Sequence, residues 1–158
     1  MIGFYVSSIK GQYDGPMMNG TDICHDAMFH NRYQIDRTTL NKFMEDKIFY
    51  QDEETIIVLE GVILNKNELC MQTSWPQFVK ECFLQDGMSF VNQFRGPFSG
   101  AIYQKAHDKW TFFTSHIGYG SVFYCNTPEG WAVGSDYHRI ASVANQTAGL
   151  NINEQAAY

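Results

Sequence analysis

The sequence predicts a single domain of the α+β class, a sandwich built from antiparallel strands. The chain has 158 residues and a hydrophobic content of 44%, which is enough for one sizeable core. Aromatic residues make up 15% of the chain, and many of them fall in short alternating runs that are typical of packed sheets. Helical patterns lie between groups of strands and do not alternate with single strands, which argues against a doubly wound parallel sheet.

The first third of the chain is predicted to consist mainly of strands. Ile2 to Ser7 is a short apolar run that precedes a loop rich in Gly, so it predicts a first strand. Ile23 to Tyr33 fits neither the helical nor the strand period cleanly, and we favour a strand. Lys47 to Tyr50 and Thr55 to Leu64 are separated by polar turn residues, so they predict a hairpin that leads into a buried strand.

The clearest helix signal begins at Ser74. Ser74 and Gln77 have the spacing of a capping box, and apolar residues then recur at steps of three and four as far as Gly87. A second short helix is predicted over Ser89 to Phe94, because the Gly-Pro pair that follows would end it.

Four further strands are predicted in the second half of the chain. They cover Phe98 to Tyr103, Trp110 to Ser115, Val122 to Cys125 and Trp131 to Val133, with turn residues between them. Because the last three runs follow one another closely, the sequence predicts that they form an antiparallel meander.

Composition and charge argue against several classes of partner. The chain carries 11 Lys and Arg against 17 Asp and Glu, which leaves no basic patch for a nucleic-acid backbone. No apolar stretch approaches the roughly 20 residues that a membrane helix needs, and no signal peptide is evident. Cys24, Cys70, Cys82 and Cys125 show no repeated spacing, which is typical of reduced thiols. We therefore expect a soluble cytoplasmic protein with no nucleic-acid or membrane partner.

Several segments resemble motifs of the amino-terminal glutaminase domain of the asparagine synthetase family. Phe94 to Tyr103 is similar to the motif Leu-x-Gly-x-Phe-Ala-Phe-Ala-Ile-Tyr, and Leu59 to Leu69 is similar to Val-Asn-Gly-Glu-Ile-Tyr-Asn-x-x-Glu-Leu. Thr114 to Tyr124 and Trp131 to Ile140 resemble two further family segments in altered form. The blocks occur in the family's order and cover most of residues 55 to 140, whereas the first third of the chain matches mainly by position.

The resemblance implies a more specific fold than the strand pattern does. It implies a four-layer αββα sandwich of two antiparallel sheets, the fold of N-terminal-nucleophile hydrolases and class II glutamine amidotransferases. It places the glutaminase-like domain at residues 1–146, and it identifies residues 147–158 as the start of a linker or of a synthetase domain.

The resemblance also indicates where a catalytic site would lie. Glutamine hydrolysis in this family uses an amino-terminal cysteine, whose thiol is the nucleophile and whose α-amino group moves the proton. Gly3 matches the glycine after that cysteine, so Ile2 occupies the nucleophile position, and an alkyl side chain has no nucleophilic atom. Ser7 or Ser8 could become an amino-terminal nucleophile only if most of the first strand were removed.

Other parts of the implied site are changed as well. The family's oxyanion hole uses an Asn-Gly pair, and here Glu60 replaces the asparagine, Gly61 is kept, and Val62 replaces the glutamate that follows. An ionised carboxylate accepts hydrogen bonds and would repel an oxyanion. Arg37 is the candidate for the arginine that binds the α-carboxylate of glutamine, and Trp75 stands where the aspartate that binds the α-amino group is expected. We predict no catalytic residue and a former substrate pocket formed by Ile2, Gly3, Arg37, Glu60, Gly61, Val62 and Trp75.

These substitutions predict a catalytically degenerate glutamine amidotransferase-like domain. By resemblance, its parent would be an asparagine-synthetase-like, ATP-dependent amide-forming ligase, in which the domain has a structural or regulatory role. The implied partner is the synthetase domain of the same longer chain, where ATP and Mg²⁺ would bind, and we expect no cofactor in this domain. A homo-oligomer is left open. The alternatives are a free-standing binding module that uses the former glutamine pocket and, as the least favoured, a residual glutaminase.

Several histidines and a cysteine were considered for other sites. Cys24, His25 and His30 lie close enough in sequence to suggest part of a metal site, but structural zinc needs four ligands at recognisable spacing, so we predict no metal. Neighbouring pairs of His and Asp are common in sequences and do not by themselves indicate a catalytic dyad. We therefore predict surface or core positions for the remaining histidines, His107 beside Asp108, His138 near Asp136, and His116.

Overall fold

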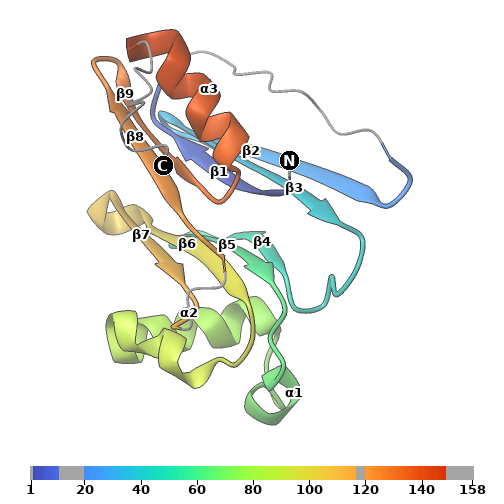
Figure 1. Cartoon of the computed structure of the whole chain (residues 1–158). Coiled ribbons are helices and arrows are strands. Elements are labelled where there is room, and N and C mark those ends of the chain that lie inside the picture. The colour runs from blue at the N-terminus through green and yellow to red at the C-terminus, as the bar shows by residue number, and fades with distance from the viewer. Residues whose placement is uncertain (1, 11–19, 117–119, 149–158) are drawn as a thin grey trace.

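Two antiparallel sheets form the centre of the protein in the computed structural model, which describes residues 2–10, 20–116 and 120–148. The strand order is β2-β3-β1-β9-β8 in one sheet and β4-β5-β6-β7 in the other. Figure 1 shows the two sheets stacked, with α3 on the outer side of the first and α2 on the outer side of the second. The prediction of an α+β sandwich of two antiparallel sheets is confirmed.

The elements have the following bounds. The five-stranded sheet contains β1 (Gly3–Ser7), β2 (Ile23–His30), β3 (Tyr33–Leu40), β8 (Phe123–Thr127) and β9 (Gly130–Gly134). The four-stranded sheet contains β4 (Ile48–Gln51), β5 (Thr55–Gly61), β6 (Phe98–Gln104) and β7 (Lys109–Thr114). The helices are α1 (Lys66–Leu69), α2 (Trp75–Asp86) and α3 (Tyr137–Ala148), and the 3₁₀ segments are η1 (Gly87–Gln93) and η2 (Lys105–His107).

Three apolar clusters of the described residues hold the layers together, and strand β5 contributes side chains to two of these clusters. Successive side chains of a strand point to opposite faces of the sheet. Ile57 and Leu59 therefore pack towards α2 and η1, while Ile56 and Val58 pack between the two sheets. A third, smaller cluster lies between α3 and the outer face of the five-stranded sheet and contains Tyr5, Ala132, Ile140 and Val143. Burial on both faces explains why β5 reads as a continuous apolar run.

The ambiguous segment from Ile23 to Tyr33 is the first part of a hairpin. It contains all of β2, a turn and the first residue of β3. Strand β3 itself was not predicted, although it is a central strand that pairs with both β2 and β1. Its buried residues include Gln34, Asp36, Arg37 and Thr39. Because these polar side chains find hydrogen-bond partners inside the fold, β3 lacks the apolar alternation from which strands are recognised.

The predicted meander of the last three strands is wrong. Strand β7 pairs with β6 in the four-stranded sheet, whereas β8 pairs with β9 in the five-stranded sheet. The chain therefore crosses from one sheet to the other between β7 and β8. Short apolar runs look alike whichever sheet they join, so closeness in sequence did not reveal this crossover.

The helix ends differ in detail from the sequence prediction. Ser74 is the N-cap residue of α2, as expected, but its side chain makes no capping hydrogen bond. Gln77 donates to Glu81 Oε1 at 2.9 Å, so the predicted capping box does not form. Helix α3 was not predicted, and it runs past the predicted domain boundary at residue 146. None of the described helices has the length and hydropathy of a membrane span.

Candidate functional site

A pocket of about 570 Å³ opens at one end of the sandwich, where β1 and β6 begin and β3 and β5 end. Most of its wall is apolar, and the polar side chains among the described lining residues are two lysines, three serines, one glutamate and one tyrosine. None of the described residues that line it is a cysteine or a histidine. The lining residues are Ile2, Gly3, Leu40, Lys42, Phe43, Lys47, Glu60, Gly61, Val62, Pro97, Phe98, Ser99, Gly120, Ser121, Phe123, Ser135 and Tyr137.

Five of the seven residues predicted for the former substrate pocket line this cavity. They are Ile2, Gly3, Glu60, Gly61 and Val62. They come from two places far apart in the sequence, the start of β1 and the end of β5. These two strands lie in different sheets, so only the stacking of the sheets brings the five residues together.

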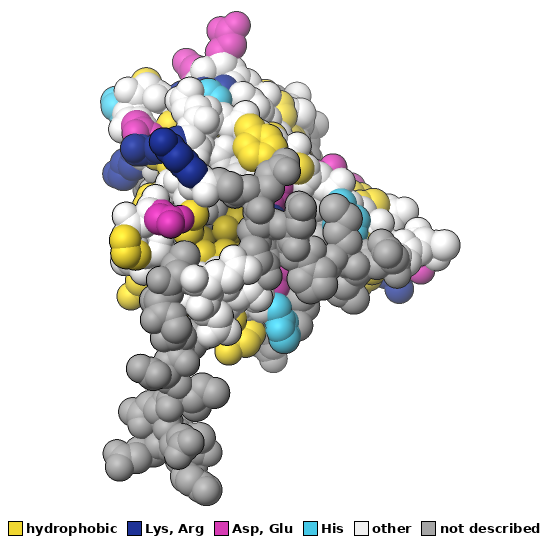
Figure 2. Space-filling model, turned by 90° about the horizontal axis from the view of Figure 1, so that it is seen from above, with side chains coloured by type: hydrophobic (Ala, Val, Ile, Leu, Met, Phe, Trp, Pro, Cys, Tyr) yellow, Lys and Arg dark blue, Asp and Glu magenta, His cyan; other side chains and the backbone are white. Residues whose placement is uncertain are grey.

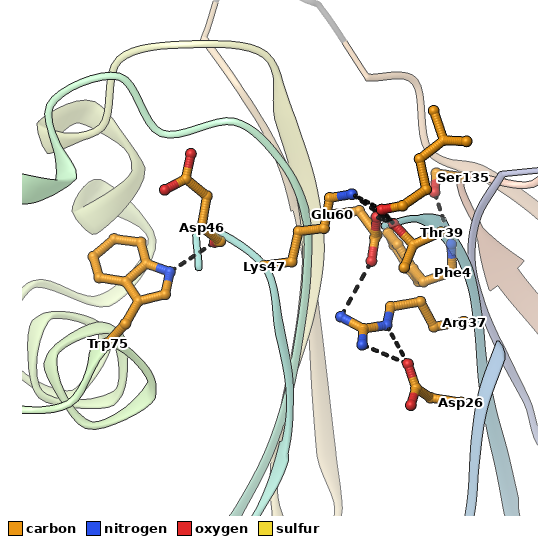
Figure 3. A network of polar contacts seen from close by, with 10 residues as sticks. Phe4, Asp26, Arg37, Thr39, Asp46, Lys47, Glu60, Trp75 and Ser135 are labelled. Atoms are coloured by element: carbon orange, nitrogen blue, oxygen red, sulfur yellow. Dashed lines mark hydrogen bonds and ion pairs between the residues drawn. The ribbon is translucent and has the colours of Figure 1, made fainter. Parts of the chain in front are cut away.

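Arg37 lies behind the pocket, next to Glu60. Its side chain is only 6% exposed, and Nη1 lies 3.4 Å from Glu60 Oε1. On its other side, Arg37 donates from Nε to Asp26 Oδ2 at 2.9 Å and from Nη2 to the same oxygen. Figure 3 shows the guanidinium between the two carboxylates. Arg37 is therefore already paired with acidic side chains of its own chain.

Trp75 does not lie in the pocket. It is buried in the cluster between α2 and the four-stranded sheet, and its indole Nε1 donates to the Asp46 carbonyl at 2.8 Å. Its ring stacks on Phe78 with centroids 5.8 Å apart. Figure 3 shows Trp75 and Asp46 well apart from Glu60 and Arg37. Trp75 is therefore a core residue, and its identity carries no information about the pocket.

Glu60 is the most buried charged residue of the pocket wall. It is 7% exposed, and its Oε2 accepts a hydrogen bond from Thr39 Oγ1 at 2.7 Å. Oε1 lies at ion-pair distance from Arg37 but makes no hydrogen bond of good geometry. Burial raises the pKa of Glu60, although the Thr39 hydrogen bond and the positive charges of Arg37 and Lys47 oppose this rise. Loss of water around the carboxylate thus outweighs the attraction of its partners.

Sequence reasoning missed Asp26, Thr39 and Lys47, which complete this network. Lys47 Nζ donates to Thr39 Oγ1 at 2.8 Å and to the Leu40 carbonyl at 2.7 Å. Asp26 and Thr39 belong to the β2-β3 hairpin, whose second strand was not recognised. The alternation of Arg37 and Thr39 on the same face of β3 is the one sequence signal that could have connected them.

Backbone geometry alone accounts for the retention of Gly61. It adopts a φ of 125°, and a Cβ added there would lie 2.1 Å from the Pro97 carbonyl oxygen. Real Cβ atoms do not approach a backbone oxygen so closely, and the conformation itself favours glycine. The glycine of the resembled Asn-Gly motif is therefore required for close packing of the β5 end against Pro97, whatever the pocket does.

Ile2, which the resemblance assigns to the nucleophile position, has no reactive side chain. Ile2 is 39% exposed and contributes only alkyl atoms to the pocket. The Ser135 hydroxyl lies beside the start of β1, and its Oγ accepts a hydrogen bond from the Phe4 amide at 3.0 Å. Ser7 and Ser8 lie outside the pocket, and both hydroxyls contact the Trp131 carbonyl. The hydroxyls of Ser135, Ser7 and Ser8 thus have hydrogen-bond partners within the fold.

The residues considered for a metal site do not gather in one place. His25 contacts Thr38 Oγ1 at 3.0 Å, while His30 packs edge-on against Tyr103 with centroids 5.6 Å apart. Within the described ranges, no group of three or more His, Cys, Asp or Glu side chains is placed to hold a metal ion. The prediction of no metal stays a prediction.

The aspartates that neighbour His107 and His138 in sequence, Asp108 and Asp136, have other hydrogen-bond partners. Asp108 joins the two sheets by accepting hydrogen bonds from the hydroxyls of Tyr33 at 2.7 Å and Tyr103 at 2.8 Å. Burial, together with this hydrogen bond to Asp108, raises the pKa of Tyr103 to about 12. Asp136 precedes α3, and its Oδ1 accepts a hydrogen bond from the Arg139 amide at 3.3 Å. His107, His116 and His138 are exposed, so of the surface or core positions predicted for them the structure shows surface positions.

Figure 2 shows one face of the molecule, on which basic, acidic and hydrophobic side chains are interspersed. The described residues on this face form no continuous basic surface. The absence of a nucleic-acid partner stays a prediction from the net charge of -6.

Comparison with models of known protein families finds none that matches this chain, and a search of curated proteins finds no match either.

Proposed function

We propose that this chain is a glutamine amidotransferase-like domain that does not hydrolyse glutamine. The observation that carries the proposal is that Ile2 and Glu60 line one pocket. The sequence resemblance placed them separately, one in the nucleophile position and the other in the oxyanion position. Their meeting in one cavity is the arrangement expected if the resemblance is correct, and both side chains are unsuited to the reaction.

The architecture supports the same proposal. Two stacked antiparallel sheets with α3 and α2 on their outer faces are compatible with the four-layer αββα sandwich that the resemblance implies. The more specific assignment to the N-terminal-nucleophile hydrolase fold is part of the proposal. Many α+β sandwiches share such layers, so the pocket carries more weight than the fold.

The proposed context is a longer asparagine-synthetase-like ligase in the cytoplasm. The domain would pack against a synthetase domain of the same chain, and that second domain would bind ATP and Mg²⁺ and form the amide bond. The role of this domain would then be structural or regulatory. The length of the gene product tests the context directly, because a ligase needs several hundred further residues that include an ATP-binding loop.

Glutamine hydrolysis is the direct test of the lost activity. The purified protein is incubated with glutamine, and glutamate release is measured for the wild type and for Ile2→Cys. We expect no turnover in the wild type and little in Ile2→Cys, because Glu60 would still face the developing oxyanion. Turnover that follows the wild-type protein through purification would contradict the proposal. Substantial glutaminase activity in Ile2→Cys would contradict the effect assigned to Glu60 and the other substituted positions.

A binding module is the second candidate, because the pocket has an apolar rim open to solvent. Ile2 is 39% exposed, Leu40 is 38% exposed and Phe43 is 56% exposed, and all three line the pocket. Exposed apolar side chains around a cavity are typical of ligand sites. A thermal-shift screen with glutamine, glutamate, asparagine and AMP tests this candidate, since a specific ligand raises the unfolding temperature. No shift with any of the four would count against it.

A further inference from the structure

The Glu60 carboxylate occupies a site that is built for a carboxylate. One oxygen accepts a hydrogen bond from Thr39 Oγ1, and the other lies 3.4 Å from Arg37 Nη1. Lys47 adds a positive charge behind Thr39, to which it donates at 2.8 Å. Hydrogen-bond donors and positive charges from β3 and from the loop before β4 thus converge on one anionic group that β5 supplies from the opposite sheet.

The balance of charge in this network depends on Glu60. Two cations, Arg37 and Lys47, face two carboxylates, Glu60 and Asp26. Asp26 engages Nε and Nη2 of Arg37, which leaves Nη1 directed towards Glu60. Removal of the Glu60 carboxylate would leave one uncompensated positive charge and the Thr39 hydroxyl without its acceptor. Asp26 would still pair with Arg37, so the network would carry one net positive charge shared with the half-buried Lys47, and this charge would attract a replacement anion.

The space vacated by Glu60 would be open to solvent. Glu60 is itself part of the wall of the pocket of about 570 Å³, whose rim also carries the exposed Lys42. A shorter side chain at this position would connect the pocket with Arg37 and Thr39. Small solutes could then reach these donors without any movement of the backbone.

We infer that Arg37, Thr39 and Lys47 form a binding site for a small monocarboxylate and that the chain fills this site with its own Glu60. In the wild type, Glu60 is thus an internal ligand that excludes free carboxylates from the base of the pocket. In Glu60→Ala, formate or acetate takes its place. The inference deepens the proposed function and rests on it, because it states what became of the carboxylate-binding end of the former substrate pocket.

Thermal unfolding at pH 7 in sodium formate, sodium acetate or sodium chloride of equal ionic strength tests the inference. The proteins are the wild type, Glu60→Ala, Glu60→Gln and, as a matched loss of one negative charge at an exposed position, Glu129→Ala. If acetate binds with a Kd of about 10 mM, then 100 mM acetate should raise the unfolding temperature of Glu60→Ala by about 3–6 °C over chloride. Glu60→Gln keeps the volume of the side chain, so it should gain no more than the wild type.

The double variant Arg37→Gln with Glu60→Ala separates this site from general salt effects, because it lacks the guanidinium and should lose the gain in formate and acetate. Where Glu60→Ala does not fold in chloride, the yield of refolded protein in acetate against chloride is the readout, and a higher yield in acetate supports the inference. Three results would overturn it. They are equal effects of acetate and chloride on Glu60→Ala, an equal gain in the wild type, and a gain that survives in the double variant. None of these measurements involves glutamine turnover, so the inference and the proposed loss of hydrolysis can fail separately.

Discussion

Replacement of Glu60 by glutamine tests which force dominates at the base of the pocket. Glutamine has nearly the same shape, and its side-chain oxygen can still accept the hydrogen bond from Thr39. The substitution removes the negative charge that faces Arg37 across 3.4 Å. It therefore compares the attraction of an ion pair with the cost of burying a charged carboxylate.

The two effects are similar in size. At an effective dielectric constant of about 20, two charges 3.4 Å apart attract by about 5 kcal/mol. Removing a carboxylate from water costs several kcal/mol, roughly the same amount. The pKa of Glu60 decides between them, because burial raises it despite Thr39, Arg37 and Lys47. We therefore expect Glu60→Gln to change the free energy of unfolding at pH 7 by no more than about 1 kcal/mol, well below the roughly 3–5 kcal/mol that breaking a buried pair usually costs.

The pH dependence has a definite sign. A carboxyl whose pKa is higher in the folded than in the unfolded protein contributes stability below its unfolded pKa of about 4.3, and that contribution is lost as the pH rises through the folded pKa. The wild type should therefore lose stability relative to Glu60→Gln as the pH rises from about 4 towards neutrality.

Urea unfolding of both proteins between pH 4 and pH 8 measures this difference. Glu129→Gln serves as the control, because it makes the same charge change on the surface. A loss of more than about 2 kcal/mol in Glu60→Gln at pH 7, with no dependence on pH, would refute the reasoning. It would mean that the ion pair with Arg37 outweighs the burial of the Glu60 carboxylate.

Two further predictions concern the framework around the pocket. Lys80 on α2 is buried and donates to Asp52 at 2.8 Å and to Glu54 at 2.6 Å, so Lys80→Met should lower the free energy of unfolding at pH 7 by about 1–3 kcal/mol in urea titrations. Burial would raise the pKa of Asp52, but hydrogen bonds from Lys80, Thr55 and Glu54 lower it overall. The loss of stability caused by Lys80→Met should therefore shrink as the pH falls below about 4. A constant loss down to pH 3 would contradict this prediction. Gly61→Ala should cost about 2 kcal/mol or more, because its Cβ would meet the Pro97 carbonyl oxygen, and an unchanged unfolding midpoint would exclude this steric explanation.

The fold was predictable wherever the sequence pattern follows from burial. Strand β5 has apolar residues that are buried on both faces, and α2 has a stripe that packs on the four-stranded sheet, so both were recognised. Strand β3 and helix α3 were not recognised. In β3, the buried Asp36 and Arg37 are paired with Arg139 and Asp26, which lie elsewhere in the sequence. Local patterns contain no information about such partners.

Some residues of the candidate site could likewise be assigned from the sequence, and others could not. The resemblance assigns Ile2 and Glu60 to the expected nucleophile and oxyanion positions from the sequence alone, and the structure places both in one pocket. The assignment of Trp75 to that pocket relied on position between motifs, and the structure places it in the core instead. Asp26, Thr39 and Lys47 belong to no sequence motif. They matter because they contact Arg37, Glu60 and each other in space, and a local sequence pattern does not show such contacts.

The sequence by itself determined which chemical groups are absent from the expected catalytic positions, because side-chain chemistry is a property of each residue alone. Only the tertiary structure decided how the remaining groups are used. Stacking of the two sheets buries Glu60 against Arg37 and closes a network of two cations and two carboxylates beneath the pocket. The physical reason is that burial and charge pairing depend on distance in space, and the residues of this network are brought together from separate strands and a loop.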